Sequence, residues 1–283
     1  METAQQTTTG VAEIKGAQLH YEIAGEGPNL VLVHAGTADK RMWDAQFAAF
    51  TRKFRVLRYD QRGYGQSAMS PFGQTLGPYS THNDLYQLLN QLGIIQAHFV
   101  ASSAGASAVI DLTLEHPEMA ASMVLVSPAV SGYEFTGPPP QTVMDLFGAR
   151  MAGELDQAAD LQAKLWAVGP KRTADQVNPA VQATLREMAR LSLTHQAPYL
   201  KDTGMLEELP LDPPAIHRLN TIKAPTLVIV GDKDDDSILE IGDLIATHIP
   251  GARKAVLKDA AHMANMEKPD QFNSLVLSFL DSL

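Results

Sequence analysis

The sequence predicts an α/β protein with a mostly parallel, doubly wound sheet that is covered by helices on both faces. Short apolar runs alternate with amphipathic helical patterns from about residue 30 to 130, and again from about 222 to the end. Runs without polar interruptions are typical of strands buried on both faces of a parallel sheet. Their alternation with helices is typical of doubly wound folds. The expected strands are residues 30–33, 54–59, 98–101, 123–126 and 226–230, and residues 255–257 are strand-like.

Two helical patterns support this interpretation. Leucines at positions 85, 88, 89 and 92 recur at the spacing of one helix face. The C-terminal segment repeats the pattern over a longer stretch, and Pro269 suits a helix start. Its apolar stripe consists of Phe272, Leu275, Val276, Phe279, Leu280 and Leu283.

The alternation stops between about residues 131 and 221, which predicts a helical insertion. Gly137-Pro138-Pro139-Pro140 is a stiff break, and only helical patterns follow it before Leu227. We expect a core domain formed by residues 11–134 and 219–283, a helical cap or lid at 135–218, and a flexible polar tail at 1–10. Met144, Phe147, Met151 and Trp166 offer the cap an apolar wall.

Composition excludes several classes of function. The 283 residues include no cysteine, so a disulfide framework, a thiolate metal site and a cysteine nucleophile are ruled out. The formal net charge is −10 without a basic stripe, which disfavours binding to nucleic acid. No apolar run could span a bilayer, and the first residues lack a signal-peptide pattern. We expect a cytoplasmic protein without a membrane partner.

The stretch from His98 to Ile110 carries the strongest chemical signal. An apolar strand enters a helix through small residues, and a serine in such a tight turn presents its hydroxyl clear of the sheet. The turn needs small residues two positions before and after the serine. Ser103 has Ala101 and Gly105 there, whereas Ser102 would have Val100 and Ala104. Ser103 is therefore the predicted nucleophile. The alternatives are Ser102 and a small-residue helix that merely packs closely on its strand.

A serine nucleophile needs a base and an orienting acid, and in this type of sheet the order is serine, acid, histidine. The strand at 226–230 ends in Gly231-Asp-Lys-Asp-Asp-Asp236, and His262 lies in a later loop. We expect one of the four aspartates to be the acid and the other three to be solvated loop residues. His217 and His248 are rival bases, but they lie at the insertion's exit and at a helix end.

An oxyanion intermediate needs backbone N–H donors that are already in place. One is expected from Ala104, directly after the predicted nucleophile. The other is expected from the loop that follows the strand at 30–33, where His34 is more consistent with a structural hydrogen-bonding role than with catalysis.

Five sequence motifs follow one another in the order found in the α/β-hydrolase superfamily. The chain resembles this superfamily from about residue 11 onward. His34-Ala-Gly36 is similar to the family's oxyanion motif, and Ala101-Ser-Ser-Ala-Gly105 to its nucleophile elbow. The remaining three are the structural loop Asp60-Gln-Arg-Gly-Tyr-Gly-Gln-Ser67, the acid loop Gly231-Asp-Lys-Asp234 and the base loop Ala261-His262.

The resemblance implies an α/β-hydrolase fold with a mostly parallel eight-stranded sheet and an inserted helical cap. It also implies Asp234 as the acid and Gly36 as the second N–H donor. We interpret Asp60 and Arg62 as structural residues. Ser103 and Gly36 argue against a dehalogenase, because that branch uses an aspartate nucleophile and a halide-binding side chain. Met42-Trp43-Asp44 resembles the 3-oxoadipate enol-lactonase and small-esterase branch, although Trp43 equally fits a core anchor.

The sequence thus predicts a serine esterase that cleaves a small or medium, partly apolar ester or lactone. The catalytic triad would be Ser103, Asp234 and His262, with the oxyanion held by the N–H groups of Gly36 and Ala104. No metal or organic cofactor is expected. The alternatives are an enol-lactonase, a carbon–carbon hydrolase or a cofactor-free perhydrolase with the same triad, and a ligand-binding receptor on the same fold. The oligomeric state stays open.

Overall fold

The computed structural model describes residues 6–70, 77–200 and 208–283. Within these ranges one sheet runs through the molecule in the order β1-β2-β4-β3-β5-β6-β7-β8. The strands from β3 to β8 are parallel to one another, whereas β2 is antiparallel to both β1 and β4. This confirms the predicted fold class. The strands are β1 (Thr8–Ile14), β2 (Ala17–Ala24), β3 (Asn29–Val33), β4 (Arg55–Tyr59), β5 (Ala97–Ser102), β6 (Ala120–Val126), β7 (Thr226–Gly231) and β8 (Arg253–Leu257).

The first two strands correct the sequence prediction at the N-terminus. The predicted tail, residues 1–10, overlaps β1, which begins at Thr8, while residues 1–5 lie outside the described residues. β1 pairs along its whole length with β2. Ala12, Ala17 and Leu19 are buried in this hairpin, and the residues between them are exposed or half-buried. Such an alternating edge lacks the continuous apolar run that identified the central strands.

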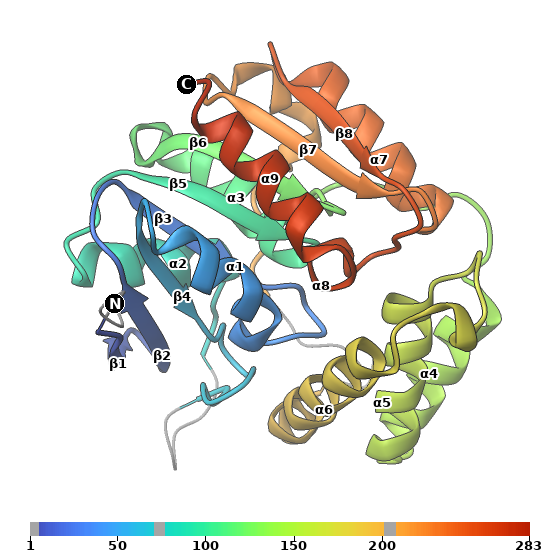
Figure 1. Ribbon diagram of the computed structural model, residues 1–283. Coiled ribbons are helices and arrows are strands. Elements are labelled where there is room, and N and C mark those ends of the chain that lie inside the picture. The colour runs from blue at the N-terminus through green and yellow to red at the C-terminus, as the bar shows by residue number, and fades with distance from the viewer. Residues whose placement is uncertain (1–5, 71–76, 201–207) are drawn as a thin grey trace.

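Helices cover both faces of the sheet (Figure 1). One face packs against α2 (Thr81–Gln91), α3 (Ala104–Glu115) and α7 (Asp236–His248), which contribute the buried residues Leu85, Val109 and Ile241. The opposite face packs against α1 (Asp44–Phe50) and α9 (Pro269–Leu280), which contribute Phe50 and Phe272. The short helix α8 (Ala264–Glu267) precedes α9. The sheet is therefore the middle layer of three.

The segment between β6 and β7 forms a separate group of helices, at the lower right of Figure 1. It consists of α4 (Gln141–Met151), α5 (Leu155–Ala163), a π-helical turn at Lys164–Val168 and α6 (Pro179–Gln196). Ala149, Ala158, Ala159, Ala189 and Leu193 form its own small core. Val181, Leu185 and Met188 of α6 instead join the core of the sheet. Leu211 and Ala215 again belong to the core beside the sheet, before the predicted insertion ends at residue 218.

Two glycines in helices test how closely α3 approaches the sheet. A Cβ atom at Gly105, near the start of α3, would lie 2.5 Å from the carbonyl oxygen of His34 and 2.8 Å from that of Val33. A Cβ atom at Gly148, within α4, would meet no atom within 4 Å. We expect Gly105→Ala to lower the free energy of unfolding by about 1–3 kcal/mol, because the added methyl group overpacks a rigid contact. Gly148→Ala should raise it by about 0.5–1 kcal/mol, because alanine favours the helix. Urea unfolding of both variants measures the two changes in the free energy of unfolding. Equal changes would contradict the close approach of α3 to the loop at Val33 and His34.

Candidate active site

Ser103 lies in the tight turn that links β5 to α3. Its backbone has φ 53° and ψ −118°, a conformation that a residue with a side chain rarely adopts. Hydrogen bonds hold the turn in place: the Ser103 N–H donates to Val126 O at 2.9 Å, and the Ser103 carbonyl accepts from Ala106 and Ala129. The neighbouring hydroxyl of Ser102 is completely buried and has no partner among the described residues. Of the two serines, only Ser103 is partly accessible.

The turn brings the two predicted N–H donors together. Because Gly105 has no side chain, the start of α3 lies against the loop that follows β3. A Cβ atom added to Gly36 in that loop would lie 3.2 Å from the Cβ of Ala104 and 3.6 Å from the Tyr64 hydroxyl. Gly36 and Ala104 line the same cavity. The amino end of a helix carries unpaired N–H groups and a partial positive charge, so the neighbourhood favours an oxyanion.

Asp234 and His262 meet at the carboxyl ends of β7 and β8. His262 Nδ1 lies 2.9 Å from Asp234 Oδ2, and each residue is 1 % exposed. The second carboxylate oxygen of Asp234 accepts from the N–H of Asp235 at 2.8 Å. An acceptor at this position favours the imidazole tautomer with its proton on Nδ1, which leaves Nε2 free to take a proton.

The other three aspartates of this loop have different partners. Asp235 caps α7 through the N–H and hydroxyl of Ser237, and Asp232 accepts from the N–H of Asp259. Asp236 is exposed and pairs with Lys171 at 2.6 Å. The rival histidines, 217 and 248, are both exposed on the surface. Within the described part of the chain, Asp234 is thus the carboxylate that contacts His262.

The loop that carries His262 is anchored at both sides. Asn265 donates from its amide to Met42 O at 2.8 Å, which ties the loop to the segment that follows the Gly36 loop. A Cβ atom on Gly231 would collide with Ala260 O, so the acid and base loops touch. No hydrogen bond joins Ser103 to His262 in the described ranges. Hydrogen bonds between a nucleophile and its base are often long without substrate and tighten when substrate binds.

Comparison with known proteins agrees with this geometry. The sequence profile described as "Alpha/beta hydrolase family" matches residues 30–275. The chain belongs to this family. Among curated relatives, a 2-hydroxy-6-oxo-6-phenylhexa-2,4-dienoate hydrolase of Comamonas testosteroni is 26% identical, over 93% of this chain and 91% of the relative. The 3-oxoadipate enol-lactonase 1 of Acinetobacter baylyi is 27% identical, over 95% of each chain.

Solved structures give the same result. The enol-lactonase from Burkholderia xenovorans is similar with a TM-score of 0.76 and 28% identity, covering 96% of this chain and 100% of that one. A hydrolase from Pseudomonas aeruginosa has a TM-score of 0.75 and 31% identity, covering 96% and 98% of the two chains. The relatives support hydrolase activity for this chain.

The inserted helices of the hydrolase lie against the acid and base loops. The rings of Trp166 and His262 have centroids 4.5 Å apart. Trp166 belongs to the π-helical turn, an irregularity that is frequent at functional sites. Close by, a Cβ atom on Gly169 would lie 3.0 Å from the Ala261 Cβ and 3.1 Å from Lys233 O. The insertion therefore contacts the sheet domain beside Asp234 and His262.

A buried ion pair ties the same two regions of the hydrolase together. Arg172 donates to Glu267 at 2.6 Å and to the carbonyl groups of Ala167 and Val168, at the end of the π-helical turn. Glu267 also accepts from the N–H of Ala261, next to His262. Both charged side chains are 6 % exposed. Sequence reasoning missed this pair, because nothing in the spacing of residues 172 and 267 relates them.

The apolar wall expected from the cap is only partly in place. Trp166 contacts His262, but Met144, Phe147 and Met151 of α4 are 49 %, 41 % and 48 % exposed. These three residues share one face of α4, and that face points to solvent. Trp43 is completely buried, 6.1 Å from the ring of Phe272, and serves as a core anchor.

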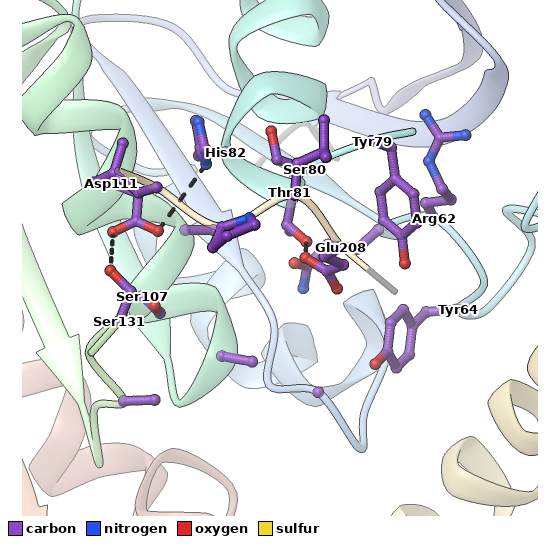
Figure 2. Close-up of a pocket in the computed structure, with 18 residues that line it drawn as sticks. Arg62, Tyr64, Tyr79, Ser80, Thr81, His82, Ser107, Asp111, Ser131 and Glu208 are labelled. Atoms are coloured by element: carbon purple, nitrogen blue, oxygen red, sulfur yellow. Dashed lines mark hydrogen bonds and ion pairs between the residues drawn. The ribbon is translucent and has the colours of Figure 1, made fainter. Parts of the chain in front are cut away.

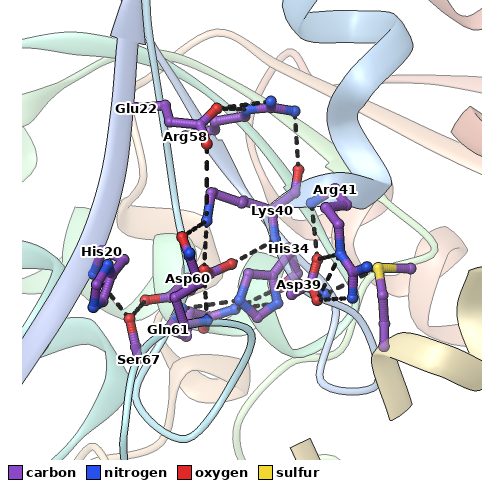
Figure 3. Close-up of polar contacts among 12 residues, drawn as sticks. His20, Glu22, His34, Asp39, Lys40, Arg41, Arg58, Asp60, Gln61 and Ser67 are labelled. Carbon is purple, nitrogen blue, oxygen red and sulfur yellow. Dashed lines mark hydrogen bonds and ion pairs between the residues drawn. The ribbon is translucent and has the colours of Figure 1, made fainter. Parts of the chain in front are cut away.

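His34, Asp60 and Arg62 have structural roles in the hydrolase. Asp60 accepts from the N–H and ammonium groups of Lys40 at 2.9 and 2.7 Å (Figure 3). Arg62 forms a two-pronged pair with Asp84 at 2.7 and 2.8 Å. His34 Nε2 accepts from the Gln61 N–H, and burial lowers the pKa of His34, so its ring is neutral. These contacts fix the loops on either side of the Gly36 turn.

A cavity of about 370 Å³ begins at Gly36 and Ala104 and continues along α3 (Figure 2). Its walls come from α3, the start of α2, the loop that follows β4, the loop that follows β6, and residues 208–211. No group of three or more metal-ligating side chains occurs in the part of the chain that the structure describes. In the same residues, no helix is long and apolar enough to cross a membrane.

Proposed function

We propose that this hydrolase cleaves a carboxylic ester or lactone through an acyl-enzyme on Ser103. The observation that carries the proposal is the 2.9 Å contact between His262 and Asp234, at the same sheet edge as the strained Ser103 turn. A weak hydroxyl nucleophile needs a base, and a base held by a buried carboxylate keeps its free nitrogen available for a proton.

The geometry supports a two-step reaction. Ser103 Oγ attacks the substrate carbonyl while His262 takes the hydroxyl proton, and Asp234 stabilises the charged imidazolium that results. The N–H groups of Gly36 and Ala104 stabilise the oxyanion, which then collapses to an acyl-enzyme as His262 gives its proton to the leaving alcohol. Water attacks the acyl group by the same route and frees Ser103. None of these steps requires a metal or an organic cofactor.

The relatives favour one second candidate. Two of them are named as a hydrolase of a phenyl-substituted dienoate and as an enol-lactonase, so carbon–carbon bond hydrolysis or enol-lactone opening by the same residues is the alternative. Rates on aryl esters, simple lactones and vinylogous diketones would separate these reactions. A ligand-binding receptor on this fold would turn over none of them at ordinary enzyme rates.

We further propose that the predicted insertion, residues 135–218, acts as a cap through α4, α5 and α6. The contact between Trp166 and His262 supports this assignment, because it puts a half-buried aromatic ring of the insertion beside the base. A cap of this kind selects substrates and excludes water without taking part in bond making.

The nucleophile is tested by comparing two adjacent serines. Ser103→Ala should lower kcat by on the order of 10⁵-fold, because the bond-forming atom is lost. The free energy of unfolding should change by less than about 1 kcal/mol, since the hydroxyl is not part of a buried network. Ser102→Ala is the control and should retain most activity. Steady-state kinetics on an aryl ester and labelling by a fluorophosphonate probe give the answer; labelling at Ser102 would refute the assignment.

The acid is tested at Asp234 with Asp235 as the matched control. Asp234→Asn keeps the size of the side chain but favours the wrong imidazole tautomer, and should cost roughly 10⁴-fold in kcat. Asp235→Asn should leave kcat within about threefold and weaken only the cap of α7, by about 1 kcal/mol or less. Single-turnover rates and urea unfolding distinguish the two. If Asp235→Asn lost activity while Asp234→Asn retained it, the assignment of Asp234 as the acid would be wrong.

The cap is tested by two aromatic residues that differ in their contacts. Trp166→Ala removes the ring beside His262 and should change KM and the preference among esters by about tenfold or more, because uniform substrate binding is lost. Phe147→Ala, at the exposed face of α4, should change neither parameter by more than about twofold. A panel of acyl chain lengths measures both variants. If Trp166→Ala and the wild type have the same KM values and the same preference among acyl chain lengths, the insertion does not act as a cap.

A further inference from the structure

The cavity in Figure 2 has a polar end that the proposed reaction does not use. It runs from Ala104 along one face of α3, past Ser107 and Ala108, to Asp111. Residues at these spacings share a helix face, and seven residues of helix rise by about 10 Å. Asp111 therefore lies about 10 Å along α3 from the predicted oxyanion site, at the far end of the same space.

Asp111 is a buried carboxylate that faces this cavity. The residue is 7 % exposed, and its Oδ1 accepts from the Ser131 hydroxyl at 2.9 Å. His82 Nδ1 lies 4.0 Å from the other oxygen. Burial raises the pKa of Asp111 to about 6, and burial lowers the pKa of His82. At neutral pH the carboxylate is charged and the nearby imidazole is not, so His82 does not neutralise Asp111.

The arginines in and near this cavity have other partners. Arg62, which lines the cavity, is held by Asp84, and Arg218 pairs with Glu115 at 3.0 Å. Glu208 adds a second carboxylate to the cavity wall, where it accepts from the Thr81 hydroxyl at 2.6 Å. Among the described residues that line the cavity, the polar end thus carries negative charge without a free cation.

We propose that this end of the cavity binds a primary ammonium group of the substrate, at the side chain of Asp111. A charge buried without a counterion is costly, and an incoming cation removes that cost. A primary ammonium has three N–H donors, which match the Asp111 carboxylate and the hydroxyls of Ser107 and Ser131 around it. This inference rests on the proposed function, because it assumes that the ester carbonyl lies at Gly36 and Ala104.

Matched ester pairs test the proposal. The first pair is phenyl 6-aminohexanoate and phenyl heptanoate, which differ by an ammonium or a methyl group at the acyl end. The second pair is 6-aminohexyl acetate and heptyl acetate, which places the same difference on the alcohol. The wild type should favour the ammonium member of one pair in kcat/KM by about tenfold or more, as expected for a close charge pair out of water. No preference in either pair would overturn the proposal.

Variants then identify the charged residue that causes the preference for the ammonium ester. Asp111→Asn keeps the side-chain size and an acceptor for Ser131, and should bring the ratio of kcat/KM values close to one while the neutral ester is hydrolysed nearly as before. Glu118→Gln is the control: it removes an exposed carboxylate just beyond the end of α3, outside the cavity, and should keep the wild-type ratio. If Asp111→Asn does not fold, Glu208→Gln should reduce the ratio. An unchanged ratio in the folded Asp111 variant would exclude this site.

The pH dependence gives a separate readout. The ratio of the kcat/KM values of the two esters cancels any titration that acts on both. It should be large above pH 6 and fall towards one as pH drops below 6, because Asp111 then becomes protonated. Ser131 and His82 are the neighbours of the Asp111 carboxylate, and the charges of Arg218, Glu115 and Glu208 also act on its pKa. A ratio that stays constant from pH 5 to 8 would contradict the assignment.

A binding experiment separates this inference from the proposed reaction. Hexylammonium and hexan-1-ol are titrated into the Ser103→Ala protein by calorimetry, which needs no turnover. Hexylammonium should bind at least about tenfold more tightly than the alcohol, and Asp111→Asn should remove the difference. If the wild type hydrolyses no ester but this difference persists, the proposed function fails and the ammonium site stands. If esters are hydrolysed but the difference is absent, the ammonium site fails alone.

Discussion

The close approach of α3 to the loop after β3 is the constraint on which the candidate site depends. Gly105 permits it, because any side chain there would overlap the carbonyl oxygens of Val33 and His34. The same contact sets Gly36 beside Ala104, the residue directly after the strained Ser103. β3 and β5 are hydrogen-bonded neighbours in the middle of the sheet, so the strain is held by a part of the molecule that cannot easily relax.

Buried charges hold the surrounding loops in position. Lys40 with Asp60 and Arg62 with Asp84 fix the segments around the Gly36 loop, and Arg172 with Glu267 joins the insertion to the base loop. Such pairs add little net stability, because removing two charges from water costs about as much as their attraction returns. What they contribute is geometry. Each ion pair fixes one relative position of the two segments that it links, whereas an apolar contact would tolerate others. The loops of this site can therefore be long and irregular and still hold the 2.9 Å contact between His262 and Asp234.

The central strands and the Ser103 turn could be predicted because their sequence signals are local. Continuous apolar runs indicate buried strands, and a row of small residues indicates a tight turn. The edge hairpin of β1 and β2 was missed because one side of it faces water. Composition alone could not separate Asp234 from its three neighbours; family resemblance selected it, and the partners of Asp232 and Asp235 account for those residues. The exposed face of α4 shows a further limit, since an apolar stripe does not say what it faces. The sequence did contain a signal for Asp111 that the prediction did not use. Asp111 is the one charged residue in the otherwise uncharged stretch 104–114.

The position of the insertion has an evolutionary consequence. β6 and β7 are adjacent and in register from Met123 with Thr226 to Val126 with Ile229, although about a hundred residues separate them in the chain. The chain leaves the sheet at the carboxyl end of β6 and re-enters it at the amino end of the neighbouring strand β7, so helices between these two strands can be lengthened, shortened or exchanged without disturbing the pairing of any strand. The residues of the proposed triad and oxyanion site lie outside this excursion, in segments before β6 and after β7. Mutation and recombination can therefore alter which molecules enter the site while the bond-breaking apparatus is inherited unchanged.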